Sequence, residues 1–273
     1  MKKIILSVAI TGARAPEEGK PARPILPDEI AKEVVAVAKA GASTCHIHAH
    51  DYDGEPTYKM EIWTEIDKKV RAALKEANVD IVLNYTTSKG TDEERMAHIR
   101  AFKPEMASYD VGTLNWMPNR IFLNDPPFLV KLGDCLTENH VLPEIEIFDG
   151  HMIKWALRLR DQGHLQDPLW FQFVLGTYGG LDATVENLVF LRSLLPNGAK
   201  WSVTGIGNGS VPMMMAALAM GCDGVRVGME DNNYMAKGVP ATNILQIERA
   251  KKIIELANCE VATPAEAREI LGL

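Results

Sequence analysis

Three histidines stand at alternate positions in one short segment of the sequence: His46, His48 and His50. In a β-strand this spacing directs all three imidazoles to the same side. The segment follows an amphipathic helical pattern that ends at Gly41 and it opens with Ser-Thr-Cys, so a strand is the favoured interpretation. Two imidazoles with one carboxylate and an open position are a ligand set typical of catalytic zinc or non-haem iron. His46 and His48 are therefore the first candidate metal ligands.

The elements that must position these histidines alternate regularly between strands and helices. The predicted strands cover residues 4–10, 44–48, 81–85, 106–109, 142–147, 170–175, 201–204 and 224–227. The predicted helices cover residues 27–40, 59–77, 92–102, 118–137, 150–162, 185–195, 212–220 and 243–256. Several strands are almost continuously apolar, as parallel strands buried on both faces must be. The alternation predicts one α/β domain over residues 1–273, a (β/α)8 TIM barrel.

One more helix is expected after the eighth unit, over residues 263–271. Thr263, Pro264 and Glu266 match the N-cap, N1 and N3 positions of a capping box. We expect this extra C-terminal helix to pack across the barrel or against a neighbouring subunit. A barrel of this size with an added helix also favours a homo-oligomer, and we expect a tetramer.

Composition narrows the class of protein. A chain of 273 residues suits a single barrel of about 250. The net charge of −7 and the scattered Lys and Arg residues argue against a nucleic-acid partner. The cysteines Cys45, Cys135, Cys222 and Cys259 lie far apart, which fits reduced thiols and a cytoplasmic enzyme. No apolar run approaches the roughly 20 residues of a membrane span, so we expect no membrane association.

In a TIM barrel the active site forms where strands end, and polar residues gather at these positions. The second and eighth strands both neighbour the first in a closed barrel, so Glu230 can complete a metal site with His46 and His48. For His50, hydrogen bonding near the site or substrate contact is favoured over ligation. The glycine-rich stretch after the seventh strand can hold an anion on its backbone N–H groups or be only a tight turn. The remaining candidates at strand ends are Arg14, Thr86, Ser108, Glu146, Gly207, Asn208, Arg226 and Asp231.

Several of these motifs occur together in one known family. The sequence resembles the β-keto acid cleavage enzymes, whose founding activity is 3-keto-5-aminohexanoate cleavage. The resemblance rests on Gly41-Ala42 before His46-x-His48, on Pro104 to Ser108, on Pro143-Glu144-x-Glu146, on Phe173 to Gly176, and on the run from Arg226 to Asp231.

The resemblance implies a zinc-bearing TIM barrel that condenses a β-keto acid with acetyl-CoA to give acetoacetate and a new acyl-CoA. By resemblance, His46, His48 and Glu230 match the metal ligands. Arg226 and Asp231 match the pair that removes a proton. Glu146 joins the catalytic residues, while Thr86 and Ser108 line the substrate site with polar groups.

The chemistry of the residues agrees with this assignment. Zinc can polarise a ketone as a Lewis acid, which makes the C2 protons of a β-keto acid acidic. Asp231, held by Arg226, is placed to remove one of them. The alternative for this pair is a structural ion pair. The alternative functions are a zinc-dependent aldolase acting without CoA and a non-catalytic binding barrel.

Departures from the family pattern concern the substrate. The founding activity has a carboxylate at position 14, where this sequence has Arg14. We therefore expect a β-keto acid with an anionic or polar tail. The alternatives for Arg14 are a solvated loop charge and a contact to a CoA phosphate. His50 and Asn208 also stand where many members have other residues.

Overall fold

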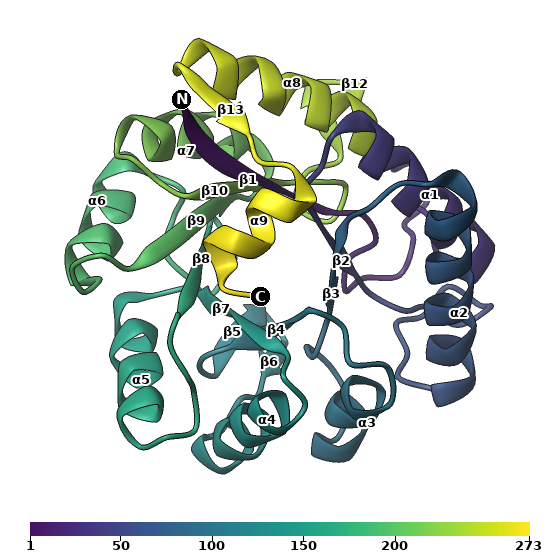
Figure 1. Ribbon diagram of the computed structural model, residues 1–273, viewed down its shortest axis with the longest axis horizontal. Helices are drawn as coiled ribbons and strands as arrows, with labels where there is room; N and C mark the ends of the chain where they lie inside the picture. The colour runs from purple at the N-terminus through teal and green to yellow at the C-terminus, as the bar shows by residue number, and fades with distance from the viewer.

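A closed barrel of eight parallel strands organises the computed structural model, which describes residues 1–273 (Figure 1). Closure comes from the pairing of the first strand with the last, with Ile5 opposite Gly224. The fold prediction is therefore confirmed. The barrel strands are β1 (Lys2–Ala9), β2 (Thr44–Ile47), β3 (Val82–Tyr85), β4 (Met106–Asp110), β7 (Leu142–Ile147), β8 (Trp170–Leu175), β9 (Lys200–Gly205) and β10 (Gly224–Val227).

Eight helices form a ring around the barrel (Figure 1). Each buries an apolar stripe against the strands, as α2 does with Ile62, Trp63, Ile66 and Val70 at helical spacing. The main core of 59 buried residues lies between this ring and the barrel wall. The helices are α1 (Pro27–Ala40), α2 (Met60–Ala77), α3 (Asp92–Phe102), α4 (Pro126–Glu138), α5 (Gly150–Asp161), α6 (Val185–Leu194), α7 (Ser210–Ala219) and α8 (Asn243–Leu256).

One predicted helix, over residues 118–137, is wrong in its first third. A β-hairpin of β5 (Leu114–Met117) and β6 (Arg120–Phe122) occupies this region, and α4 begins only at Pro126. Asp125 accepts a hydrogen bond from the backbone N–H of Phe128 and so caps the helix. A proline at N1 after an aspartate is a helix start, and this signal outweighs the apolar residues that precede it.

Three short strands were not expected from the sequence. The hairpin of β11 (Tyr234–Ala236) and β12 (Val239–Pro240) follows the eighth barrel strand. The strand β13 (Cys259–Val261) pairs in parallel with the first residues of β1, with Lys2 opposite Cys259. These strands are too short for their side-chain pattern to be distinguished from loops.

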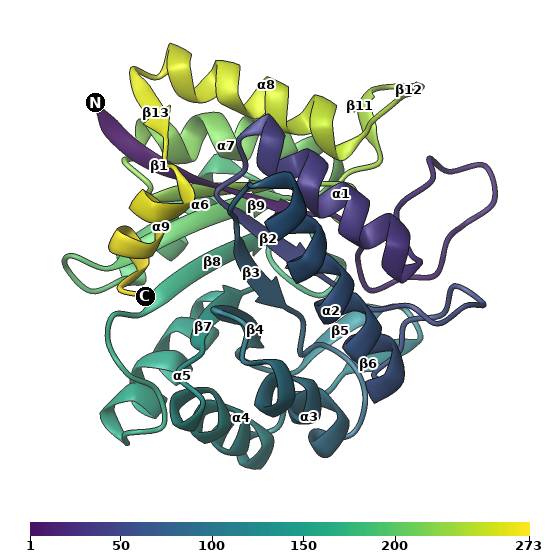
Figure 2. The same cartoon turned by 45° about the vertical axis from the view of Figure 1, so that its right-hand side comes forward.

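The extra C-terminal helix, α9 (Pro264–Leu271), lies across the amino end of the barrel (Figure 2). Its capping box is present as expected, with Thr263 and Glu266 bonded reciprocally. Leu271 packs into a separate apolar cluster with Ile5, Met106 and Trp170. The helix therefore closes the end of the barrel opposite to the predicted site.

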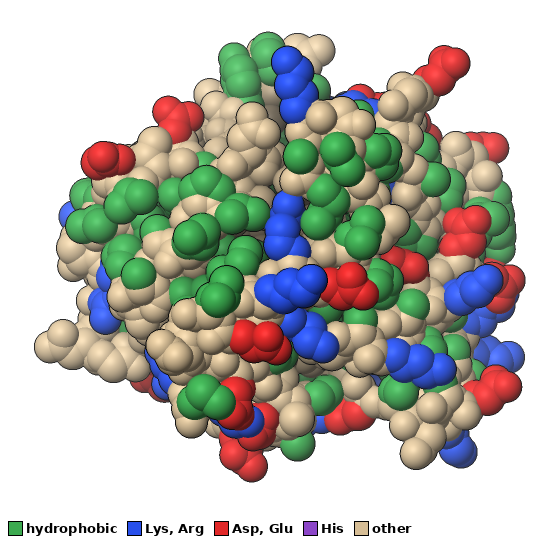
Figure 3. All heavy atoms as spheres, turned by 90° about the horizontal axis from the view of Figure 1, so that it is seen from above, with side chains coloured by type: hydrophobic (Ala, Val, Ile, Leu, Met, Phe, Trp, Pro, Cys, Tyr) green, Lys and Arg blue, Asp and Glu red, His purple; other side chains and the backbone are tan.

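Charged side chains are mixed on the face of the molecule shown in Figure 3. Lys and Arg residues lie there among Asp and Glu residues and do not form a continuous basic stripe. None of the helices combines the length and the apolarity that a membrane crossing needs.

Candidate active site

Three predicted metal ligands lie together at the carboxyl end of the barrel. The Nε2 atoms of His46 and His48 are 3.0 Å apart. Glu230 places one carboxylate oxygen 3.2 Å from Nε2 of His48 and the other 3.8 Å from Nε2 of His46. The three ligand atoms lie within 4.8 Å of one another, as a shared cation would require.

The barrel strands bring these residues together. β1 pairs with β2 on one side and with β10 on the other. Ala9 of β1 lies opposite His46, and the end of β10 also lies beside β1. After β10 the chain turns at Gly228, whose φ of 142° disfavours other residues. A Cβ at this position would lie 2.2 Å from the carbonyl oxygen of Ala9. This close approach lets the N–H of Glu230 donate to the same carbonyl at 3.2 Å.

The chemistry of the cluster fits a divalent cation. Burial lowers the pKa of His46 to about 3, so its imidazole is neutral and able to coordinate. Burial acts to raise the pKa of Glu230, but His48 and Arg226 outweigh it, and the carboxylate is ionised. One buried oxygen of Glu230 has no hydrogen-bond donor. A metal ion would satisfy this oxygen, and two His with one Glu suit zinc, iron or manganese.

Arg226 lies among four carboxylates next to this cluster. It binds Asp231 through two hydrogen bonds of 3.0 Å, one to each carboxylate oxygen. It also donates to Glu146 at 2.9 Å and lies 3.3 Å from Glu230 and 4.0 Å from Glu144. Burial acts to lower the pKa of Arg226, but these carboxylates raise it well above its ordinary value. Its charge is therefore permanent and orients the surrounding acids.

The acids around Arg226 have altered proton affinities. Burial raises the pKa of Asp231, and Arg226 limits that rise. Burial raises the pKa of Glu146 well above its ordinary value, and the neighbouring Asp110 adds to this effect. Burial also raises the pKa of Glu144. Asp231 is thus a stronger base than an exposed aspartate, whereas Glu146 can retain a proton.

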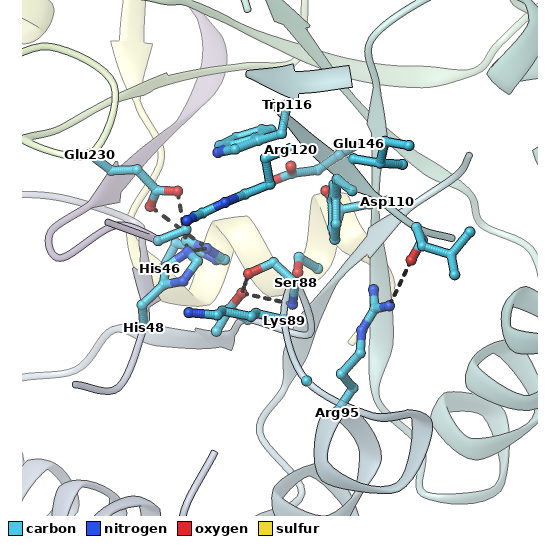
Figure 4. A pocket seen from close by; sticks show the side chains of 17 residues that line it. His46, His48, Ser88, Lys89, Arg95, Asp110, Trp116, Arg120, Glu146 and Glu230 are labelled. Carbon is cyan, nitrogen blue, oxygen red and sulfur yellow. Dashed lines mark hydrogen bonds and ion pairs between the residues drawn. The ribbon is translucent and has the colours of Figure 1, made fainter. Parts of the chain in front are cut away.

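Two cavities open from this cluster. One has a volume of about 310 Å³ and is lined by His46, His48, Thr86 and Ser108. The other has a volume of about 470 Å³ and is lined by Arg226 and Asp231. They share Ala13, Trp116, Glu146 and Glu230. Figure 4 shows Trp116 and Arg120 reaching from the hairpin of β5 and β6 over the first cavity. The candidate metal cluster therefore lies where the two cavities meet.

The other predicted site residues differ in their placement. Thr86 and Ser108 line the smaller cavity, and the Ser108 hydroxyl accepts a hydrogen bond from the N–H of Thr87. The N–H of Gly207 donates to the carbonyl of Asp231, so it is not free to hold an anion, although Gly207 lines the larger cavity. The side chain of Asn208 is exposed and lines neither cavity.

His50 and Arg14, for which the sequence left more than one role open, are in contact at the loop after β1. His50 is fully buried and is not in the metal cluster. Its Nε2 donates to the carbonyl of Arg14 at 3.1 Å, so it fixes this loop. The Arg14 side chain is exposed and lines the larger cavity.

Sequence reasoning missed several cationic and aromatic residues that line the cavities. Arg120 falls within the predicted helix over residues 118–137 and Trp116 just before it, whereas the structure places both in a hairpin. The Pro118-Asn119 turn and the Asp125-Pro126 helix start are the signals that would have revealed that hairpin. No sequence signal marks Lys89 or Arg23, because both stand in irregular loops.

The fold and the cluster together define a (β/α)8 barrel with a candidate metal centre beside an Arg–Asp pair, the arrangement of an enzyme. The model of the beta-keto acid cleavage enzyme family matches residues 3–273, and the chain belongs to this family. The expected family and enzyme class are therefore confirmed.

Individual relatives agree with this membership. A 3-keto-5-aminohexanoate cleavage enzyme of Acetoanaerobium sticklandii is 40% identical, over 100% of this chain and 99% of the relative. A 3-oxoadipate:acetyl-CoA acetyltransferase of Cupriavidus necator is 30% identical, over 98% and 94% of the two chains. The solved ternary complex of ObcA with a C4-CoA adduct and oxalate shares the fold, with a TM-score of 0.78, 21% identity, and coverage of 92% of this chain and 67% of that one.

Proposed function

We propose that this enzyme uses a divalent metal, with zinc as the expected ion, to exchange acyl groups between a β-keto acid and acetyl-CoA. The products are acetoacetate and a new acyl-CoA. The observation that carries the proposal is the position of Asp231, held at both oxygens by Arg226 in a cavity beside the His46, His48 and Glu230 cluster. The names of the relatives support acetyl-CoA as the second substrate.

His46, His48 and Glu230 are the residues that would hold the metal. The bound ion would supply Lewis acidity to the ketone and carboxylate oxygens of the keto acid. The neutral imidazole of His46 and the ionised carboxylate of Glu230 are both suited to a divalent cation. A bound divalent cation would keep a net positive charge beside the cavities and would attract an anionic substrate.

Asp231 acts as the base that takes a proton from C2 of the keto acid. Arg226 holds the carboxylate in one orientation through both of its oxygens, and Asp231 lines the larger cavity. Burial raises the pKa of Asp231 and strengthens it as a base. The resulting C2 carbanion attacks the carbonyl carbon of the acetyl thioester, and the CoA thiolate leaves.

The thiolate then adds to the original ketone carbon. The bond from this carbon to C2 breaks, which gives the new acyl-CoA and the carbanion of acetoacetate. Asp231 returns its proton to C2, so the cycle consumes no net proton. Glu146 lines both cavities, and its raised pKa lets it donate a hydrogen bond to oxygens that become negative during the exchange.

Arg14, Thr86, Ser108, Gly207 and Asn208 remain proposed substrate contacts. The exposed side chain of Arg14 gives it access to the larger cavity, in keeping with an anionic or polar tail. If Arg14→Glu leaves the preference between dicarboxylic and amino-substituted acids unchanged, this part of the proposal is wrong. A cytoplasmic homo-oligomer, with a tetramer favoured, stays a prediction.

Mass spectrometry tests the reaction directly. The zinc-loaded protein is incubated with acetyl-CoA and a pool of β-keto acids, and we expect acetoacetate together with one new acyl-CoA mass. Removing the metal with a chelator should abolish both products, and adding zinc back should restore them. If no acid reacts while zinc is present at the site, acyl exchange is wrong. Cleavage in the absence of acetyl-CoA would favour the aldolase alternative instead.

A further inference from the structure

Arg23, in the loop between β1 and α1, is a partly buried cation without an acidic partner. No carboxylate lies within 4.0 Å of its guanidinium, unlike the ion-paired Lys20 in the same loop. Its Nη2 donates to the carbonyl oxygens of Arg14 and Ala15, at 2.7 and 3.3 Å. These bonds fix the plane of the guanidinium while the Nη1 and Nε donors have no partner in the chain.

Gly12 lies next to both the guanidinium of Arg23 and the side chain of Glu230, a predicted metal ligand. A Cβ on Gly12 would lie 2.8 Å from Nη1 of Arg23 and 3.2 Å from Cβ of Glu230. Gly12 has a φ of 90°, so both the backbone and the space at this position require glycine. A side chain at residue 12 would therefore crowd both the guanidinium of Arg23 and the side chain of Glu230.

Arg23 also lines the larger cavity together with Asp231 and Glu230. The two carboxylates that act on it most, those of Glu230 and Glu17, are both outside ion-pair distance. Burial lowers its pKa, because a charged group loses hydration in this position. A half-buried guanidinium with free donors is stabilised by an anion that enters the cavity, and its planar fork suits a carboxylate.

We infer that Arg23 binds a carboxylate at the far end of the keto-acid tail, so that the preferred substrate is a dicarboxylic β-keto acid. This inference rests on the proposed function for the placement of the reacting end at the metal. The tail then extends from the cluster along the larger cavity toward Arg23. Arg14, exposed and on the same loop, contributes a weaker attraction because water screens it.

Binding measurements without acetyl-CoA test this assignment separately from the acyl exchange. Titration calorimetry of the zinc-loaded protein compares 3-oxoadipate with 3-oxohexanoate, which has the same chain length and no second carboxylate. We expect 3-oxoadipate to bind more tightly, and Arg23→Gln to reduce this preference by about 10- to 100-fold. Arg23→Lys should retain part of it, and Arg14→Gln should change it less than Arg23→Gln does.

Two outcomes with the Arg23→Gln variant would overturn the inference. One is an equal loss of affinity for both acids in Arg23→Gln, which would mean that Arg23 only holds the loop. The other is a higher KM of Arg23→Gln for acetyl-CoA but not for S-acetylpantetheine, which lacks the nucleotide. That result would mean that Arg23 binds a phosphate of CoA. Turnover of any β-keto acid by the wild-type enzyme, with no tail preference, would keep the proposed function and refute only the role of Arg23.

Discussion

At the amino end of the barrel α9 packs Leu271 against Ile5 and Trp170, whereas at the carboxyl end Arg226 lies among four carboxylates. The same eight strands build both ends. The amino end is closed, and no water-sized space remains among its apolar side chains. The carboxyl end opens into two cavities and buries charges that cost free energy to desolvate.

The two ends of the barrel differ in what they contribute: the amino end contributes mainly to stability, and the carboxyl end carries the candidate active site. Apolar burial at the closed end contributes to the free energy of unfolding without restricting the site. The acidic groups at the open end repel one another, and Arg226 offsets part of this repulsion. Changes at the open end should therefore alter rates and pH dependence, while changes at the closed end should alter only the stability.

The largest effect is expected at the base in the open end. Asp231→Asn keeps the shape of the side chain but replaces one carboxylate oxygen with an NH2 group, and it cannot accept a proton from C2. We expect kcat to fall by about 10²- to 10⁴-fold, with metal content unchanged. NMR of deuterium exchange at C2 of the keto acid, in excess of the spontaneous rate, isolates this step.

The matched control is Asp53→Asn, at an exposed position in the loop after β2 that lines neither cavity, which should leave both kcat and exchange unaltered. Exchange at the wild-type rate in Asp231→Asn would show that another group is the base.

A change at the closed end should alter the stability and leave the reaction rate unchanged. Leu271 is 2% exposed, and Leu271→Ala removes buried methyl groups from the cluster beneath the barrel. We expect the free energy of unfolding in urea to fall by about 3 kcal/mol, with kcat/KM unchanged. Leu273→Ala, at a side chain that is 42% exposed, serves as the control. A change in kcat/KM with Leu271→Ala would show that the two ends are coupled.

The smallest effect is a pH dependence of stability that arises beside the open end. His98 is buried, stacks on Trp63 and bonds the carbonyl of Thr86 at 2.9 Å. Burial lowers its pKa from 6.5 to about 4. Between these two pH values the unfolded state binds more protons at His98 than the folded state does. The free energy of unfolding therefore falls as the pH falls, by about 2 kcal/mol at pH 5.

Urea unfolding at pH 7.5 and pH 5 measures this contribution. His98→Phe should reduce the loss of stability on acidification, and the exposed His151→Phe should not. An unchanged loss in His98→Phe would assign the pH dependence to other buried groups.

The sequence by itself determined the barrel and the type of chemistry. Parallel strands buried on both faces must be apolar, and their regular alternation with helices marks eight units. Alternation also puts His46 and His48 on one side of a strand, which is a local property of the backbone. The capping box at Thr263 and Glu266 is local in the same way, and it is present as expected.

Only the tertiary structure decided what surrounds these ligands. Arg226 bonds Glu146, 80 positions away along the chain, because closure of the barrel brings β7 and β10 to a common interior. The loop between β1 and α1 is held partly by His50, which bonds the carbonyl of Arg14 from 36 positions away. Such contacts leave no periodic pattern in the sequence, so the two cavities and their cations appear only in the folded chain.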